Sequence, residues 1–407
     1  MVEKKKDVIV LGGGPAGSFS AMQLVAMRPE LTERIVLLEA KRQGRDKVCA
    51  GGVSGRVMRR SREQLGIDIA SLPGRDIDGL NPRFMDMEAK ATKKGFGKVI
   101  RRDVLDSFLL DRARDAGVTV FTETPATRIQ RTSDGVSVET KEGTFTGKVL
   151  IAADGVNGLT KRTLGLDSIG RKEFLYMARL PELDMPPRLI VDYSPILDGV
   201  PGYAWFFPEE KGLNAGITGG SPGNMKLLKS VFFKMVQKNL GADIKGEEPT
   251  MQVWPERFFS VSVPSYSERI LFVGDNLGVT PLTGEGIGVC FDSSRAAAQE
   301  ALRALDRNDY SFRMYPWRLK TCEFFPTWSL EHIFLELKSP MLFRLFFMLT
   351  TERNKPIEKT LMDLYCRIFA GDIHISYLTA LHLMCTMTPS WKLLKSLVLG
   401  DKSERYS

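Results

Sequence analysis

Residues 7–27 of the chain read DVIVLGGGPAGSFSAMQLVAM. Asp7 to Leu11 is a short run of β-branched and other apolar residues, and it ends at a cluster of glycines that begins at Gly12. Ser18 to Met27 consists largely of good helix formers. The order of these patterns predicts a strand, a tight turn and a helix.

A second strand is predicted shortly after this helix. Pro29 disfavours a helical conformation at Arg28, so the helix should end there. Residues Arg34 to Leu38 then form an apolar run that is typical of a buried parallel strand, and the run ends at Glu39. The first 39 residues therefore predict a complete βαβ unit.

The turn of this unit carries the spacing Gly12-x-Gly14-x-x-Gly17. Glycines allow a tight turn and a close backbone approach, and the free amides and dipole of the following helix attract a pyrophosphate. Glu39 comes 22 residues after Gly17, where a carboxylate can accept both ribose hydroxyls of an adenosine and disfavours the 2′-phosphate of NADP. The pattern predicts NAD or FAD, with a glycine turn that binds nothing as the alternative.

Three further motifs distinguish between these two nucleotides. They are Arg102-x-x-x-Asp106-x-x-Leu109, Ala153-Asp154-Gly155, and Gly274-Asp275 followed by Pro281-x-x-Gly284-Glu285-Gly286-Ile287. With them, residues 7–300 resemble the para-hydroxybenzoate hydroxylase-like flavoprotein superfamily. The resemblance implies FAD as the cofactor and a Rossmann-type α/β domain that binds it. The cofactor-binding residues implied by the motifs and the resemblance are Gly12, Gly14, Ala16, Gly17, Glu39, Cys49, Ala50, Gly52, Arg102, Ala126, Asp275, Gly286 and Ile287.

Asp275 has a physical reason to contact the flavin. It follows the apolar strand Ile270 to Val273, where its carboxylate can hold a ribityl hydroxyl. The helix that starts near Gly286 directs its N-terminal amides toward the isoalloxazine. The alternative is an aspartate that only caps a helix in a loop.

Two stretches resemble the geranylgeranyl reductase family within this superfamily. Lys47-Val48-Cys49-Ala50-Gly51-Gly52 resembles its Cys-Gly-Gly stretch, and Gly202-Tyr203-Ala204-Trp205-Phe206-Phe207-Pro208 resembles its Tyr-x-Trp-x-Phe-Pro motif. Enzymes of this family saturate carbon–carbon double bonds of isoprenoid chains on chlorophyll precursors, archaeal lipids or quinones, with reduced FAD as hydride donor. The resemblance implies the same reaction here, on an isoprenoid lipid or another apolar small molecule. It also implies an external electron donor such as NAD(P)H or ferredoxin.

The second stretch supplies the expected substrate-binding residues. Tyr203, Trp205 and Phe207 share one face of a strand, because strand side chains alternate, and an aromatic wall suits a prenyl chain. The alternative is an aromatic core strand. By resemblance Cys49 lies near the flavin, where a thiol could assist protonation, so it is the candidate catalytic residue; an inert loop cysteine is the alternative.

The chain departs from its relatives at two motifs. Gly274-Asp275-Asn276-Leu277 stands where they usually have Gly-Asp-Ala-Ala, and Gly158 replaces the serine that commonly follows Asp-Gly. Gly278 stands where the hydroxylases usually have His, which counts against that class. The alternatives to a prenyl reductase are a FAD-dependent monooxygenase or halogenase acting on an aromatic or apolar substrate, and a binding protein without turnover.

The rest of the pattern predicts an inserted sheet and a helical end. A helix at 104–116 precedes strands at 118–123, 126–131, 136–140 and 144–153, which predict a β-meander returning to the nucleotide-binding sheet. Strands at 188–193, 203–207 and 213–218 and a helix at 225–240 predict a β-sheet substrate domain. We expect a discontinuous FAD-binding domain at 1–75, 100–165 and 256–300, the substrate domain at 76–99 and 166–255, and a C-terminal helical region at 301–407.

Composition limits the classes of protein and partner. The 407 residues are 43% hydrophobic and 26% charged, which is ordinary for globular domains. Five cysteines without a Cys-x-x-Cys pair or a Cys/His cluster predict a reduced, cytoplasmic chain with no structural metal. The net charge of +8 comes from scattered basic residues, which argues against nucleic acid as a partner.

The C-terminal region raises the question of a membrane surface. No window reaches the length of apolar sequence that a spanning helix requires. Residues 336–350 and 379–398 mix bulky apolar side chains with Lys and Arg, which predicts peripheral contact with an anionic membrane; packing helices are the alternative. His332, His374 and His382 all lie in this region, so we expect no acid–base role for them.

Overall fold

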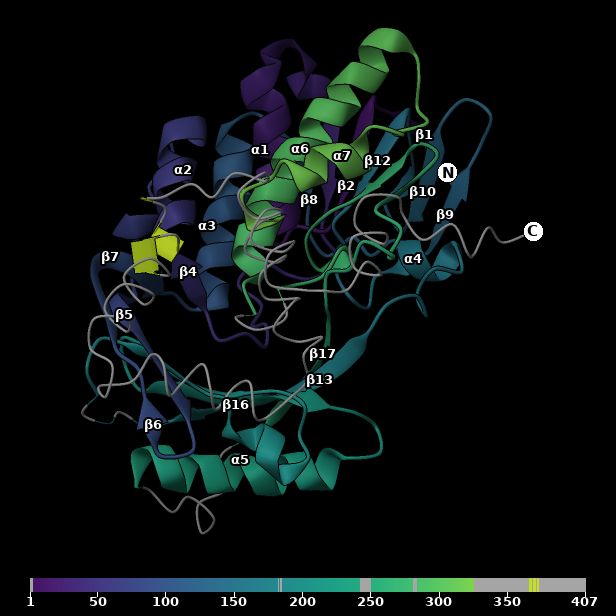
Figure 1. The fold of residues 1–407 in the computed structure, drawn as a ribbon. Helices are drawn as coiled ribbons and strands as arrows, with labels where there is room; N and C mark the ends of the chain where they lie inside the picture. The colour runs from purple at the N-terminus through teal and green to yellow at the C-terminus, as the bar shows by residue number, and fades with distance from the viewer. Residues whose placement is uncertain are drawn as a thin grey trace.

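The structure is a computed structural model, and it describes residues 3–181, 183, 185–241, 250–280, 284–325, 366–367, 369–370 and 372. Two large sheets organise these residues, and a smaller sheet flanks the first of them. Figure 1 shows helices α1, α3 and α6 beside one large sheet and helix α5 beside the other. The described helices are α1 Pro15–Met27, α2 Gly55–Leu65, α3 Arg102–Asp115, α4 Leu159–Thr163, α5 Met225–Leu240, α6 Gly286–Arg307 and α7 Tyr315–Lys320.

The dinucleotide-type sheet has six strands in the order β18-β19-β12-β2-β3-β8. All four residues of its central strand β2 and of its neighbour β3 are buried, because helices and further strands cover both faces. Strands β19, β12, β2, β3 and β8 run parallel, and β18 is antiparallel to β19. The bounds are Tyr266–Ser267 for β18, Ile270–Phe272 for β19, Val149–Ala152 for β12, Val8–Leu11 for β2, Ile35–Leu38 for β3 and Thr119–Phe121 for β8. The predicted βαβ unit is therefore confirmed.

Helix α1 packs against helix α6, although 270 or so residues separate them in the sequence. The ring of Phe19 meets the ring of Phe291 edge-on, with centroids 5.0 Å apart. The Ser294 hydroxyl donates a hydrogen bond of 2.7 Å to the carbonyl oxygen of Ala16. These contacts bring the N-terminal ends of both helices to the same side of the sheet.

A four-stranded sheet in the order β1-β11-β10-β9 lies beside the first. Its bounds are Glu3–Lys5 for β1, Arg128–Arg131 for β9, Val136–Thr140 for β10 and Gly143–Gly147 for β11. The prediction of a single strand at 144–153 is wrong, because this segment forms two strands in two different sheets. Strand β11 ends at Gly147, and β12 belongs to the six-stranded sheet. The carbonyl oxygen of Asp7 accepts hydrogen bonds from the amides of Lys148 and Val149, and this turns the chain from one sheet to the other.

The nine-stranded sheet follows the order β17-β13-β16-β15-β14-β5-β7-β4, with β6 paired to β5. Its bounds are Gly52–Ser54 for β4, Arg75–Phe84 for β5, Met87–Glu88 for β6, Ala91–Val99 for β7, Lys172–Leu180 for β13, Leu189–Asp192 for β14, Ala204–Pro208 for β15, Leu213–Gly220 for β16 and Gln252–Arg257 for β17. The predicted strands and helix between 188 and 240 are present. Strands β5 and β7 lie in a region where the sequence showed no clear pattern.

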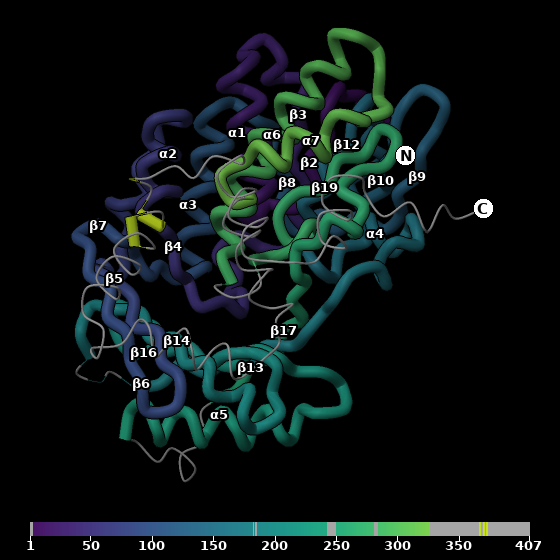
Figure 2. The backbone as a smooth tube through the Cα atoms, in the orientation of Figure 1, coloured from purple at the N-terminus to yellow at the C-terminus, as the bar shows by residue number. Residues whose placement is uncertain are grey.

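Alternation along its strands separates the two faces of this sheet. Tyr176, Ala178 and Phe206 pack with Phe232 of helix α5 on one face. Leu175, Met177, Tyr203, Trp205 and Phe207 cluster on the other face. Figure 2 shows α5 running along the side of the sheet that is turned away from the dinucleotide-type sheet. The second face is therefore turned toward the dinucleotide-type sheet.

The Rossmann-type fold with an inserted sheet is confirmed, while the domain boundaries stay a prediction. No helix within the described ranges is both long and apolar enough to cross a membrane. Residues 326–365 and 373–407 lie outside the described residues. The two segments expected at a membrane surface and the three histidines fall in those ranges.

Candidate active site

A cavity of about 650 Å³ lies between the six-stranded sheet and the inner face of the nine-stranded sheet. Its lining includes residues from the glycine turn, the loop after β3, the start of α6 and strands β5, β13, β14, β15 and β17. Of the sequence-predicted site residues, the cavity is lined by Gly12, Gly14, Ala16, Glu39, Cys49, Ala50, Gly52, Arg102, Ala126, Tyr203, Trp205, Phe207, Asp275, Gly286 and Ile287. Gly17 is the one that does not line it.

The glycine turn has no room for side chains at two of its positions. Gly12 has a φ of +109°, and a Cβ there would lie 2.3 Å from the carbonyl oxygen of Ala153. A Cβ at Gly17 would lie 1.7 Å from the carbonyl oxygen of Gly12. Gly17 therefore serves the close packing of helix α1 on the turn, and Gly12 serves the turn itself. The open cradle that results suits a pyrophosphate at the N-terminus of α1.

Glu39 lies at the carboxyl end of β3, next to this turn. Its carboxylate accepts the backbone amides of Gly13 at 2.5 Å and Lys41 at 2.8 Å, and the Arg45 guanidinium is 3.6 Å away. The side chain is buried but lines the cavity, so it can accept a ribose hydroxyl there. Ala126 lines the same cavity.

A buried ion pair lies beside the glycine turn. The Arg102 guanidinium binds both carboxylate oxygens of Asp106, at 2.7 and 2.9 Å. Burial opposes the charge of Arg102, but Asp106, together with other nearby groups that include Asp275, outweighs the burial and raises the pKa of Arg102 above its usual value. Arg45, which the sequence reasoning missed, lies 3.5 Å from Asp106 and lines the cavity close to Gly14. The basic run in the loop after β3 was the signal for it.

Asp275 follows strand β19 in the 3-10 turn Gly274–Asn276. Its carboxylate forms an ion pair of 2.6 Å with the ammonium of Lys47. Burial alone would raise the pKa of Asp275, but the charge of Lys47, with Arg102 and Arg45 behind it, lowers that pKa below its usual value. Lys47 begins the motif that ends at Gly52, but it is not among the residues that the sequence predicted for the site. The pair provides an ionised acceptor and a cation beside the N-terminus of α6.

The two departures from the flavoprotein motifs meet at one carboxylate. Asn276 donates to Asp154 at 2.8 Å, and the backbone amide and hydroxyl of Thr160 donate to its other oxygen. A Cβ at Gly158 would lie 2.3 Å from the Asp154 carboxyl carbon. Asn276 thus holds the carboxylate in the space that a side chain at position 158 would need. Gly158, without a side chain, leaves room for the Asp154 carboxylate that Asn276 binds.

The aromatic residues of the second motif form the apolar part of the cavity. Tyr203, Trp205 and Phe207 are each less than a tenth exposed, and the rings of Tyr203 and Trp205 have centroids 6.4 Å apart. The Trp205 indole donates to Asn214 at 2.9 Å, and Asn214 donates to the Cys49 carbonyl oxygen at 2.9 Å. The aromatic strand is therefore both a core strand and a cavity wall.

Two thiols line the cavity. The Sγ atom of Cys49 accepts the amide of Gly51 at 3.4 Å. Burial raises the pKa of Cys290 to about 12, so that thiol stays neutral and weakly acidic. A catalytic role for Cys49 stays a prediction.

Glu256 of strand β17 is a cavity residue that the sequence reasoning missed. Burial and the negative charges of Asp275 and Glu173 raise the pKa of Glu256 to about 8, and the positive charge of Lys47 opposes this rise only in part. No motif marks this residue, and the sequence predicted no strand at its position.

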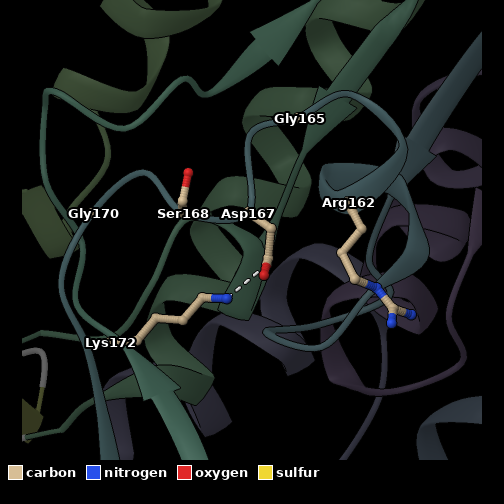
Figure 3. A pocket seen from close by; sticks show the side chains of 6 residues that line it. All are labelled: Arg162, Gly165, Asp167, Ser168, Gly170 and Lys172. Atoms are coloured by element: carbon tan, nitrogen blue, oxygen red, sulfur yellow. Dashed lines mark hydrogen bonds and ion pairs between the residues drawn. The ribbon is translucent and has the colours of Figure 1, made fainter.

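A second pocket, of about 470 Å³, lies on the surface beside helix α4. Figure 3 shows its Lys172 and Asp167 pointing toward one another, with an ion pair of 2.6 Å, while Arg162 points away from them. The charge of Lys172 is thus paired within the pocket. Residues of the sequence motifs line the larger cavity instead.

A family model described as an FAD binding domain matches residues 5–189. The chain is 29% identical over 326 residues to digeranylgeranylglycerophospholipid reductase 1 of Methanopyrus kandleri, covering 75% of this chain and 82% of that one. It is 28% identical to the digeranylgeranylglycerophospholipid reductase of Methanocaldococcus jannaschii, covering 75% of this chain and 79% of that one.

Solved structures share the fold. A geranylgeranyl bacteriochlorophyll reductase-like protein from Thermoplasma acidophilum superimposes with a TM-score of 0.72 at 22% identity, covering 97% of this chain and 99% of that one. A flavin-dependent brominase superimposes with a TM-score of 0.70 at 16% identity, covering 94% and 99%. The fold is therefore common to reductases and halogenases.

Proposed function

Because this chain belongs to the geranylgeranyl reductase family of FAD-dependent oxidoreductases, we propose that it saturates carbon–carbon double bonds in the isoprenoid chains of a lipid. The expectations of an FAD cofactor and of oxidoreductase activity are confirmed. The names of the relatives point to a substrate class, a glycerophospholipid that carries two geranylgeranyl chains. Our proposal extends that class to this chain.

One observation carries the proposal: a single cavity joins a polar end suited to FAD with an aromatic end suited to a hydrocarbon. At the polar end, the glycine cradle fits the pyrophosphate, Glu39 the ribose, and Asp275 a ribityl hydroxyl. At the other end, Tyr203, Trp205 and Phe207 lie among aliphatic side chains of the inner sheet face. A flavin and a prenyl chain in this cavity would be neighbours.

FAD, when bound and reduced by an external donor, supplies a hydride for the alkene. The side chains have three tasks in the reaction. The aromatic wall holds the chain by apolar contact and excludes water from the reacting carbons. The Lys47–Asp275 pair orients the polar part of the cofactor, and a proton donor must supply the second hydrogen.

The experiment that tests this function is anaerobic. The purified protein is reduced with dithionite, given a digeranylgeranyl glycerophospholipid, and followed by flavin absorbance and by mass spectrometry of the lipid. We expect flavin reoxidation without oxygen and a gain of two hydrogens per saturated bond. A flavin that reoxidises only with oxygen would favour a monooxygenase or halogenase. A flavin that neither lipid nor oxygen reoxidises would indicate a binding protein.

A further inference from the structure

The register of strand β17 with β13 determines which face of the sheet carries Glu256. Glu256 lies opposite Glu173 of β13, and Trp254 lies opposite Leu175. In an antiparallel pair, opposite residues place their side chains on the same face, and every second residue shares that face. Leu175 and Trp254 belong to the aromatic cluster of the cavity, so Glu256 is on the cavity face too.

The charged groups that face Glu256 come from three other elements. Asp275 lies in the turn after β19, Lys47 in the loop after β3, and Glu173 on the neighbouring strand β13. Lys47 is engaged by Asp275, and Glu173 is engaged by Arg171. Glu256 is thus surrounded by two carboxylates and by a cation that another group already neutralises.

Other carboxyl groups of the cavity form an ion pair or accept a hydrogen bond. The carboxylate–partner pairs are Asp46 with Arg179, Asp275 with Lys47, Glu285 with Arg56, Asp154 with Asn276, and Glu39 with backbone amides. Among the described residues, no hydrogen bond or ion pair reaches the carboxyl group of Glu256. A carboxyl group without such a partner, in a partly desolvated place, prefers its neutral form.

We propose that Glu256, as a neutral carboxylic acid, is the proton donor to the alkene in the reduction proposed above, on which this inference rests. It combines three properties: a place on the cavity wall, a position beside Asp275 at the flavin end, and no partner for its charge within the part of the chain that the structure describes. Its pKa of about 8 leaves the proton in place at neutral pH and near enough to that pH for efficient transfer. Cys290 lines the same cavity but is a far weaker acid.

Saturation of one double bond requires a hydride and a proton. The O–H bond of Glu256 breaks as its proton forms a C–H bond at one carbon, a hydride forms a C–H bond at the other carbon, and the π bond between the two carbons is lost. FAD, when bound and reduced, would supply the hydride with its two electrons, and an external donor such as a nicotinamide nucleotide or a ferredoxin would restore these electrons. The carboxylate of Glu256 regains its proton from water.

The first test needs no turnover and uses the FAD-loaded protein. Folding raises the pKa of this carboxyl group from 4.5 to about 8, so the folded state holds the proton more tightly than the unfolded state. The contribution of Glu256 to the stability of the folded state is therefore complete below pH 4.5, and it is lost as the pH rises toward 8. Glu256→Gln keeps the shape and cannot ionise. We expect the melting temperature of Glu256→Gln to match the wild type at pH 5 and to exceed it by several degrees at pH 8.5. Equal melting temperatures at both values would overturn the neutral-acid assignment.

The second test measures flavin reoxidation by lipid in a single anaerobic turnover. We expect Glu256→Gln to retain FAD and to slow this step by about 10²–10⁴-fold, which is the usual contribution of a general acid to the rate. In the wild type the rate should fall above about pH 8, where Glu256 loses its proton. A Glu256→Gln protein that turns over at the wild-type rate and with the wild-type pH profile would overturn the proposal.

Glu173→Gln is the matched comparison, because Glu173 lies opposite Glu256 and does not line the cavity. The negative charge of Glu173 raises the pKa of Glu256, so its removal should move the alkaline fall in rate to lower pH while turnover persists. An unmoved pH profile would contradict the role of Glu256. If the wild type reduces no prenyl lipid at all, the proposed function fails, and the melting experiment still decides the state of Glu256.

Discussion

At the scale of single residues, the site depends on carboxylates that differ in their surroundings. Glu39 accepts backbone amides, Asp275 pairs with Lys47, and Glu256 has neither kind of partner among the described residues. The three groups lie in one cavity, yet the first two suit contact with hydroxyl groups as acceptors and the third suits proton donation. The environment, and not the residue type, separates their tasks.

Replacement of Glu39 by arginine should weaken the retention of FAD. The change removes the acceptor for the ribose and leaves the amides of Gly13 and Lys41 without their partner. We expect at least a tenfold higher Kd, which corresponds to about 1.4 kcal/mol. The ratio of FAD to protein after gel filtration measures it. Glu33→Arg, an exposed position before β3, is the control and should keep its flavin; equal loss in both variants would contradict the role of Glu39.

Replacement of Trp205 by alanine should separate lipid turnover from flavin binding. Trp205 lies on the aromatic wall, and its indole reaches Asn214 and through it the Cys49 carbonyl. We expect FAD to remain bound while lipid turnover is lost, at a cost of about 3–5 kcal/mol in the free energy of unfolding. Trp205→Phe, which keeps an apolar ring, should retain more of the turnover. Flavin loss as severe as in Glu39→Arg would show that Trp205 serves the core instead.

At the scale of elements, the turn after β19 and the loop after β12 act as one unit. Asn276 of the first binds Asp154 of the second, and the Lys161 ammonium donates to the Asn276 carbonyl oxygen at 2.5 Å. Helix α4 supplies Lys161, so three segments position the turn that carries Asp275. This local network replaces the residues that related flavoproteins usually have at positions 158 and 276.

The two departures should therefore be coupled energetically. Gly158→Ser places a Cβ against the Asp154 carboxyl group, and we expect it to cost about 1–3 kcal/mol in the free energy of unfolding. Asn276→Ala releases that carboxylate, so the double variant should be more stable than the sum of the single effects predicts. Urea denaturation of all four proteins measures the coupling. Simple additivity would contradict the network.

At the scale of the whole molecule, the cavity belongs to neither large sheet alone. The dinucleotide-type sheet contributes its polar end and the nine-stranded sheet contributes its aromatic face. A ligand that fills the space between them contacts both bodies and stabilises their arrangement. In the proposed reaction, only this arrangement would bring the hydride donor and the alkene together.

Removal of FAD should lower the stability of the whole chain in a concentration-dependent way. A ligand that binds the folded state at 100 times its Kd adds about 2.7 kcal/mol to the free energy of unfolding. We expect the melting temperature of the apo-protein to rise progressively as FAD is added back. Thermal melts over a series of FAD concentrations measure this. A melting temperature independent of FAD would contradict a cofactor held between the two sheets.

The sequence determined the βαβ unit, its glycine turn and the acid at the end of β3, because each depends on neighbours within a few tens of residues. It also determined the family, since Lys47 to Gly52 and Gly202 to Pro208 are contiguous motifs. The tertiary structure alone decided that Lys47 pairs with Asp275, 228 residues away, and that Asn276 and Gly158 compensate for one another at Asp154. It also decided the surroundings of Glu256, because the charge state of a carboxyl group depends on burial and on partners from distant segments, which no local pattern encodes.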